Sequence, residues 1–203
     1  MIKNCQITKA QQDVNNIVYR GRIIWRDIST WISTYLMVKT LQGDTELLEK
    51  IKEKLLRIVE DFGGLMRTFF GDKAAADYIN LFSEYIMHIT SLIDALVEGN
   101  SNAADEIVKQ IYESAGKRIE LLTEINPYWD KNTLENYIYT FTDMTIKEII
   151  AFTSKQYESS INIYERILSY STGLGDFLAQ GIKNYLMYNL EPPTNVGSPP
   201  TVE

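Results

Sequence analysis

The sequence contains few of the residues from which catalytic and metal sites are commonly built. Its 203 residues include one cysteine, Cys5, and one histidine, His88. A single cysteine cannot form an internal disulfide, and a single histidine excludes a multi-histidine metal centre. Glycine-rich phosphate loops, Cys-x-x-Cys pairs, zinc-protease motifs and Gly-x-Ser-x-Gly motifs are absent as well. We therefore expect no catalytic residue and no required cofactor, and we favour a non-catalytic protein over an enzyme.

Basic charge and long apolar runs are also scarce. The formal net charge is −7 and the isoelectric point is near 4.9, whereas nucleic acids and anionic membranes bind basic surfaces. No apolar run approaches the ~20 residues of a membrane-spanning helix, and the start MIKNCQITKAQQD has no apolar stretch typical of a signal peptide. These absences predict a cytoplasmic protein that binds neither nucleic acid nor membrane.

The chain is rich in amphipathic helical pattern and almost free of proline. Four of the five prolines lie in the last dozen residues, so only Pro127 interrupts the first 190. Apolar residues recur at alternating steps of four and three, and the pattern breaks near residues 43, 71, 99, 128 and 155. We predict an all-α fold, a six-helix antiparallel bundle built from three helical hairpins, residues 12–70, 72–126 and 132–190. These form a single domain, 1–190, followed by a flexible proline-rich tail, 191–203.

The breaks carry residues that end and cap helices. Gly43 suits a left-handed position after the first helix, and Asp44 or Thr45 can cap the next. Ser101 or Asn102 can cap the helix after Gly99, and Asn132 with Glu135 resembles a capping box. Three of the turns are 56 residues apart, and this spacing aligns the apolar triplets Ile51/Ile107/Ile163, Leu55/Ile111/Ile167 and Met66/Leu122/Leu178. Either a triple repeat or the regular build of any equal-helix bundle explains the alignment.

Glu84 and His88 are the first candidate metal ligands, because a spacing of four places them on one face of a helix. Carboxylate and imidazole ligands of this kind hold metals inside helical bundles. The Glu-x-x-His motif of di-iron bundles is absent, however. The alternative is an ordinary surface or partly buried pair, which we favour.

Glu148 is a second candidate, because the steps Phe141, Thr145, Glu148 and Phe152 place its carboxylate in an apolar stripe. A buried carboxylate is paired, protonated or bound to a cation. Asp143 completes the tentative metal set of Glu84, His88, Asp143 and Glu148. The alternative, which we favour, is a small rotation of the helix that carries Glu148 to solvent.

Aromatic residues are abundant, with thirteen tyrosines and three tryptophans. Trp25, Trp31 and Tyr35 share one side of the first helix and are expected in the core, in a pocket or at an oligomer interface. Trp129 stands in the turn INPYWDKNT. Of the three tryptophans, we expect Trp129 to contact a partner.

Four segments resemble an uncharacterised family of small bacterial all-helical proteins, whose members are sometimes labelled acetylglutamate kinase. They are FFGDKAAADYINLFSEYI (69–86), LIDALVEGNSNAAD (92–105), INPYW (125–129) and YTFTDMTIKEIIA (139–151). The resemblance covers most of residues 20–188 and implies a helical fold. It implies no kinase activity, because the chain has neither a glycine-rich nucleotide loop nor an α/β alternation.

The resemblance also implies an ancestral metal or haem site. Members carry histidines where this chain has Ile28, Tyr85 and Phe141, beside acids that correspond to Glu84, Asp143 and Glu148. The three histidine positions hold non-ligating or weakly ligating side chains here. Metal binding is therefore our second hypothesis.

Three hypotheses follow for the function. The first is a non-catalytic helical scaffold or interaction protein that forms a homo-oligomer or binds a protein partner. The second is a ferritin-like protein that binds iron, zinc or manganese in the bundle core. The third is a small-molecule sensor with a closed apolar pocket between helices.

Overall fold

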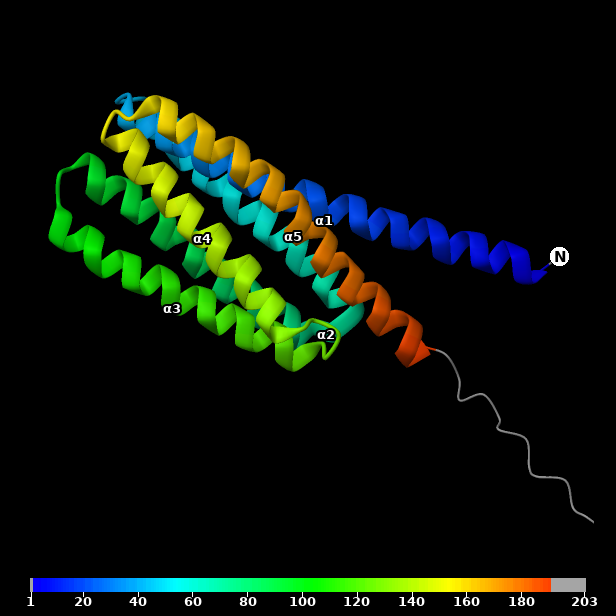
Figure 1. The fold of residues 1–203 in the computed structure, drawn as a ribbon. Coiled ribbons are helices and arrows are strands. Elements are labelled where there is room, and N and C mark those ends of the chain that lie inside the picture. Colours follow the sequence, from blue (N-terminus) through cyan, green and yellow to red (C-terminus); the bar gives the residue numbers. More distant parts are fainter. Residues whose placement is uncertain (1, 191–203) are drawn as a thin grey trace, which may run out of the picture.

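The computed structural model describes residues 2–190, with side chains from 16 to 188, and is all-helical over that range (Figure 1). It contains five helices and no strand in this part of the chain: α1 (Ile2–Thr40), α2 (Thr45–Val97), α3 (Ser101–Ile125), α4 (Lys131–Thr153) and α5 (Tyr157–Leu190). The all-α prediction is confirmed. The prediction of six separate helices is not, because no loop divides α2. The proline-rich tail, 191–203, lies outside the described residues.

Helix α2 nevertheless changes direction at Gly71, where the sequence predicts a turn. Gly71 has φ 84° and ψ 175°, a conformation that residues with a Cβ atom rarely adopt. The segments on either side fold back on each other, since the rings of Phe62 and Tyr78 lie 5.0 Å apart. Figure 1 shows the two halves of α2 running alongside each other. The conformation of this one glycine thus reverses the chain at the place where the sequence predicts a loop.

Helices α1 and α5 pack antiparallel, and the first part of α1 extends beyond the other helices (Figure 1). Their backbones meet at two glycines. A Cβ atom on Gly175 would lie 2.8 Å from the backbone nitrogen of Arg22, and one on Gly21 would lie 2.9 Å from the oxygen of Gly175. The Arg22 guanidinium also binds Asp176, with Nη2 to Oδ2 at 2.8 Å. This crossing fixes the register between the two helices.

The remaining turns lie where the sequence places them, although the capping residues differ. Asp44 caps α2 as predicted, by accepting a hydrogen bond from the backbone of Glu46. Asn100, not Ser101 or Asn102, caps α3, and Asp130, not Asn132, caps α4. The left-handed residue after α1 is Gln42, with φ 57°, and not Gly43. At α3 and α4 the capping side chain thus stands one or two residues before the predicted one.

The core is one continuous apolar cluster that contains several aromatic rings packed edge to face or tilted against one another. Trp25 of α1 contacts Phe62 and Phe82 of α2 and Phe141 of α4, with ring centroids 5.3–6.5 Å apart. Trp129 is buried too, and its indole N–H donates to the Leu178 carbonyl at 3.0 Å. The prediction that Trp129 contacts a partner is therefore wrong. A backbone carbonyl of α5 satisfies its only polar atom.

No helix in the described part of the chain is both long and apolar enough to cross a membrane.

Candidate functional site

The structure disperses the four predicted metal ligands. Glu84 is exposed on α2, and Asp143 of α4 forms an ion pair with Lys147, with 2.7 Å between Oδ2 and Nζ. His88 is half-buried, and its Nδ1 atom is enclosed without a hydrogen-bond partner. Among the side chains from 16 to 188, no three His, Cys, Asp or Glu residues gather closely enough to hold a metal ion.

Glu148 lies inside the bundle, so our preference for a solvent-exposed Glu148 is wrong. Its exposed fraction is 2 %. Burial raises the pKa of Glu148 to about 7, and a hydrogen bond with Ser33 of α1 partly opposes that rise. The Glu148 carboxylate lies in the apolar stripe of α4 that the sequence indicates. Helix α4 is not rotated in a way that carries this carboxylate to solvent. Burial therefore favours the protonated form of this carboxyl group.

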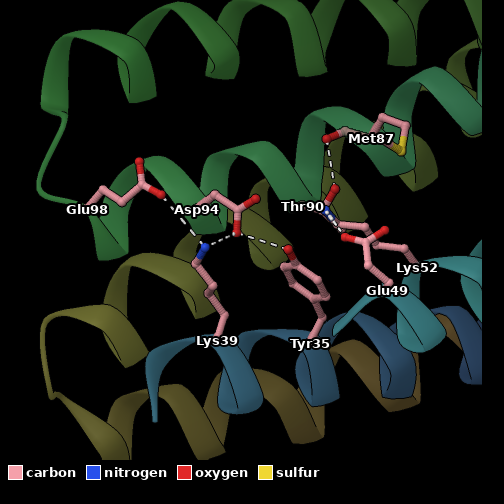
Figure 2. A network of polar contacts seen from close by, with 8 residues as sticks. All are labelled: Tyr35, Lys39, Glu49, Lys52, Met87, Thr90, Asp94 and Glu98. Carbon is pink, nitrogen blue, oxygen red and sulfur yellow. Dashed lines mark hydrogen bonds and ion pairs between the residues drawn. The ribbon is translucent and has the colours of Figure 1, made fainter. Parts of the chain in front are cut away.

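A polar network joins the end of α1 to both halves of α2 (Figure 2). The Tyr35 hydroxyl donates to Asp94 at 3.0 Å, and Lys39 Nζ lies 3.1 Å from the same carboxylate. Lys52, which pairs with Glu49, lies over the Tyr35 ring, with Nζ 5.4 Å from the ring centroid. Desolvation and the Asp94 charge raise the pKa of Tyr35. Each of the five charges here, Glu98 beside Lys39 included, has an oppositely charged neighbour, so we assign this network to stability.

Exposed apolar side chains gather at the end of the bundle that carries the α1–α2 and α4–α5 turns. We call these residues the end surface, and they are exposed by between 42 % and 70 %: Met37, Leu41, Leu47, Ile150, Tyr157 and Ile161. The turns are neighbours because α1 and α5 are antiparallel: Tyr164 donates to Thr30 at 3.3 Å, and Arg26 to the Leu168 carbonyl at 3.3 Å. A shallow hollow between α4 and α5 adjoins this end and includes Ile150 and Ile163 in its lining.

Arg118 of α3 is the ionisable residue that the sequence analysis missed. It is completely buried, its guanidinium lies over the rings of Phe82 and Tyr85, and a side-chain hydrogen bond joins it to the buried Tyr78 hydroxyl. The spacing could have revealed it, because Ile111, Ala115, Arg118 and Leu122 follow the same steps of four and three that expose Glu148 as unusual. A charge in such a stripe calls for an internal acceptor.

The three positions at which the family resemblance implies histidine all lie in the core. Ile28, Tyr85 and Phe141 are each buried, with exposed fractions of 1 % or less. Tyr85 contacts Thr142, with 3.4 Å between the two hydroxyl oxygens. Nothing at these positions is a strong metal ligand in this chain.

Comparisons of the chain with models of protein families, with curated proteins and with solved structures give no match. The family resemblance described from the sequence therefore stays a prediction, carried by the four quoted segments.

Proposed function

We propose that this protein is a non-catalytic helical interaction protein that self-associates through the end surface. The observation that carries the proposal is the end surface itself, to which α1, α2, α4, α5 and the α1–α2 turn contribute large apolar side chains. Leu41, at 70 %, is the most exposed large apolar side chain of the described residues, and Ile161, at 59 %, follows Tyr188 and Tyr19, which lie elsewhere. Contiguous exposed apolar residues mark interaction sites more often than isolated ones do.

A second copy of the chain is the partner that we propose. A two-fold interface needs one self-complementary patch. The end surface offers apolar side chains on both sides of the seam, the line along which α1 and α5 pack against each other. The neighbouring hollow, whose lining includes Ile150 and Ile163, can receive a side chain from the other copy. Burial of such residues on both copies supplies the hydrophobic driving force for association.

The test places one charge on each side of the seam. The double variant Leu41→Glu/Ile161→Glu is expected to have the mass of one chain in light scattering, because a buried carboxylate at each contact opposes association. The matched control Tyr19→Glu/Met87→Glu adds the same charge at exposed apolar positions outside the end surface, and it is expected to keep the mass of the unmodified protein. Equal masses for both double variants would count against the end surface.

The ferritin-like alternative has weaker support, since Glu84, His88, Asp143 and Glu148 form no group of three in the described structure. What favours it is the enclosed Nδ1 of His88 and the buried Glu148 carboxyl group. Elemental analysis after expression with added iron, zinc and manganese tests it. One metal ion per chain, lost in Glu148→Gln, would establish the alternative.

A further inference from the structure

A second hollow lies between α4 and α5, farther from the α4–α5 turn than the hollow beside the end surface. Its volume is about 390 Å³ and it is open to solvent, and small-molecule sites have volumes of this order. Each wall comes from one helix face, because the residues of each wall are spaced by three or four. We call it the ring hollow, and its lining residues are Tyr137, Thr140 and Met144 of α4 with Arg166, Ser169, Tyr170 and Gly173 of α5.

Aromatic rings supply much of the apolar lining of the ring hollow. The Tyr137 ring packs against the rings of Tyr170 and Phe177, and both centroid distances are 5.3 Å. The Tyr170 hydroxyl donates to the Asn136 carbonyl at 3.2 Å, which holds the Tyr170 ring in place. Gly173 adds no side chain to the hollow, and a Cβ atom there would already lie 3.5 Å from the Tyr137 hydroxyl oxygen. The lining therefore leaves ring surface open to a flat apolar group.

Arg166 is the charged residue of this lining, and no aspartate or glutamate lines the hollow. Its side chain is exposed, and it has no ion-pair or hydrogen-bond partner among the described side chains. Ser169 lies three residues farther along the same face of α5, and its hydroxyl likewise has no partner within the described part of the chain. A guanidinium and a hydroxyl donor beside rings are a suitable set of partners for a singly charged anion.

We propose that the ring hollow binds a small aromatic carboxylate. The two carboxylate oxygens match the N–H fork of the Arg166 guanidinium, and the Ser169 hydroxyl donates to the same group. The ring of the ligand lies against the rings of Tyr137 and Tyr170. A phosphate ester fits less well, because its second negative charge has no further cation in the lining. This site is separate from self-association through the end surface.

Sodium benzoate is the probe, titrated into the isotope-labelled chain at constant ionic strength while NMR follows the backbone amide shifts. We expect saturable shifts that gather on the parts of α4 and α5 around the ring hollow. Two further ligands separate the contributions, since acetate has the charge without the ring and benzamide has the ring without the charge. Each should bind at least about tenfold more weakly than benzoate, because one of the two contacts is lost.

Variants test the charge and the space separately. Arg166→Met should weaken benzoate at least about tenfold and leave benzamide unchanged, whereas Arg57→Met, at an exposed arginine of α2, should bind benzoate as the unmodified chain does. Gly173→Leu places a side chain in the hollow and should weaken both ligands. Gly64→Leu is its control, because a Cβ atom on Gly64 meets no atom within 4 Å. Circular dichroism checks that each variant is folded.

The proposal is overturned if benzoate causes no saturable shift, or if acetate or benzamide binds as tightly as benzoate. Unchanged benzoate binding in Arg166→Met, or shifts that gather away from α4 and α5, would overturn it as well. The double variant Leu41→Glu/Ile161→Glu should keep the benzoate response whatever its mass. A loss of the response there would show that the shifts report self-association, and this would also contradict a separate site.

Discussion

At the scale of single residues, the interior formed by the described side chains holds an arginine and a glutamate on different helices, Arg118 of α3 and Glu148 of α4. They act differently because only one of them can become neutral near physiological pH. Glu148 can take up a proton and keep a hydrogen bond with Ser33, whereas Arg118 stays charged. The carboxyl group therefore makes stability depend on pH, whereas the guanidinium keeps its charge beside the Tyr78 hydroxyl and the rings of Phe82 and Tyr85.

Glu148→Gln is expected to remove a pH dependence of stability. Burial raises the pKa of Glu148 from 4.5 to about 7, so between these values the folded state holds a proton that the unfolded state has released. Stability then falls as the pH rises through this window, by on the order of 3 kcal/mol, and levels off above it. Urea unfolding at pH 5 and pH 8 should show this loss for the unmodified chain and a much smaller one for Glu148→Gln.

The control is Glu84→Gln, which changes an exposed glutamate of α2 to the same amide. It is expected to keep the slope of the unmodified chain. An unchanged slope in Glu148→Gln would show that another group causes the pH dependence.

Asp94→Ala is expected to weaken the network that joins α1 to α2. The substitution removes the acceptor of the Tyr35 hydroxyl and the partner of Lys39 at once. Tyr35 is buried and Asp94 only partly exposed, so we expect a loss of about 1–2 kcal/mol in the free energy of unfolding. Asp77→Ala breaks an exposed pair with Lys73 on the same helix and should change stability little. Equal losses for both variants would contradict a special role for Asp94.

Sequence spacing could predict that Glu148 lies in an apolar stripe, and the same rule applied to α3 would have found Arg118. Neither their partners nor their degree of burial could be predicted, because these depend on how far α3 and α4 rotate against α2 and α1. The residue spacing alone cannot distinguish rotations that either bury Glu148 or carry it to solvent. Trp129 shows the same limit, since the Leu178 carbonyl that it binds is 49 residues away.

At the scale of helices, two glycines let the backbones of α1 and α5 approach closely, and a third glycine bends α2. Gly21 and Gly175 lie against each other, so a side chain on either would meet backbone atoms of the other helix. Backbone cannot rotate away as a flexible side chain can, and the helices would have to separate.

Gly175→Ala and Gly64→Ala are expected to change stability in opposite directions. A Cβ atom on Gly175 would lie 2.8 Å from backbone atoms of Gly21 and Arg22, whereas one on Gly64 would meet no atom within 4 Å. We expect Gly175→Ala to lose about 1–3 kcal/mol through overpacking, and Gly64→Ala to gain about 0.5–1 kcal/mol from helix propensity. Urea unfolding measures both. A gain of stability in Gly175→Ala would show that α1 and α5 are not closely packed where they cross.

Four of the five predicted breaks became true turns between helices, because glycine, proline and capping side chains act locally. The break at residue 71 became a bend within α2. The two helical segments of α2 meet at Gly71, whose positive φ reverses the chain without a loop. The capping residues of α3 and α4 lie one or two residues before the predicted ones. Asn100 and Asp130 both precede the positions at which the sequence pattern for a helix cap is stronger.

At the scale of the whole molecule, the hairpin spacing agrees with the packing of the core. Two of the three triplets that the 56-residue offset aligns are buried in full, Leu55/Ile111/Ile167 and Met66/Leu122/Leu178. Ile107 and Ile163 of the third triplet are only half-buried, while Ile51 is enclosed. Duplication of a hairpin stays a prediction.

The same arrangement brings two turns together at one end and leaves apolar side chains exposed there. Leu41 lies in the α1–α2 turn, and Tyr157 and Ile161 lie near the start of α5, where their side chains are exposed and do not cover the core. Their exposure is therefore the feature of the whole molecule that its own packing does not explain. The proposed self-association would account for it by burying the end surface against a second copy.

The most direct test is the molar mass of the unmodified chain in solution, measured by light scattering over a range of concentrations. One chain has a mass of 23.4 kDa. The proposed association predicts at least twice that mass at high concentration, with a decline on dilution if the complex is weak. A mass of one chain at every concentration would contradict it.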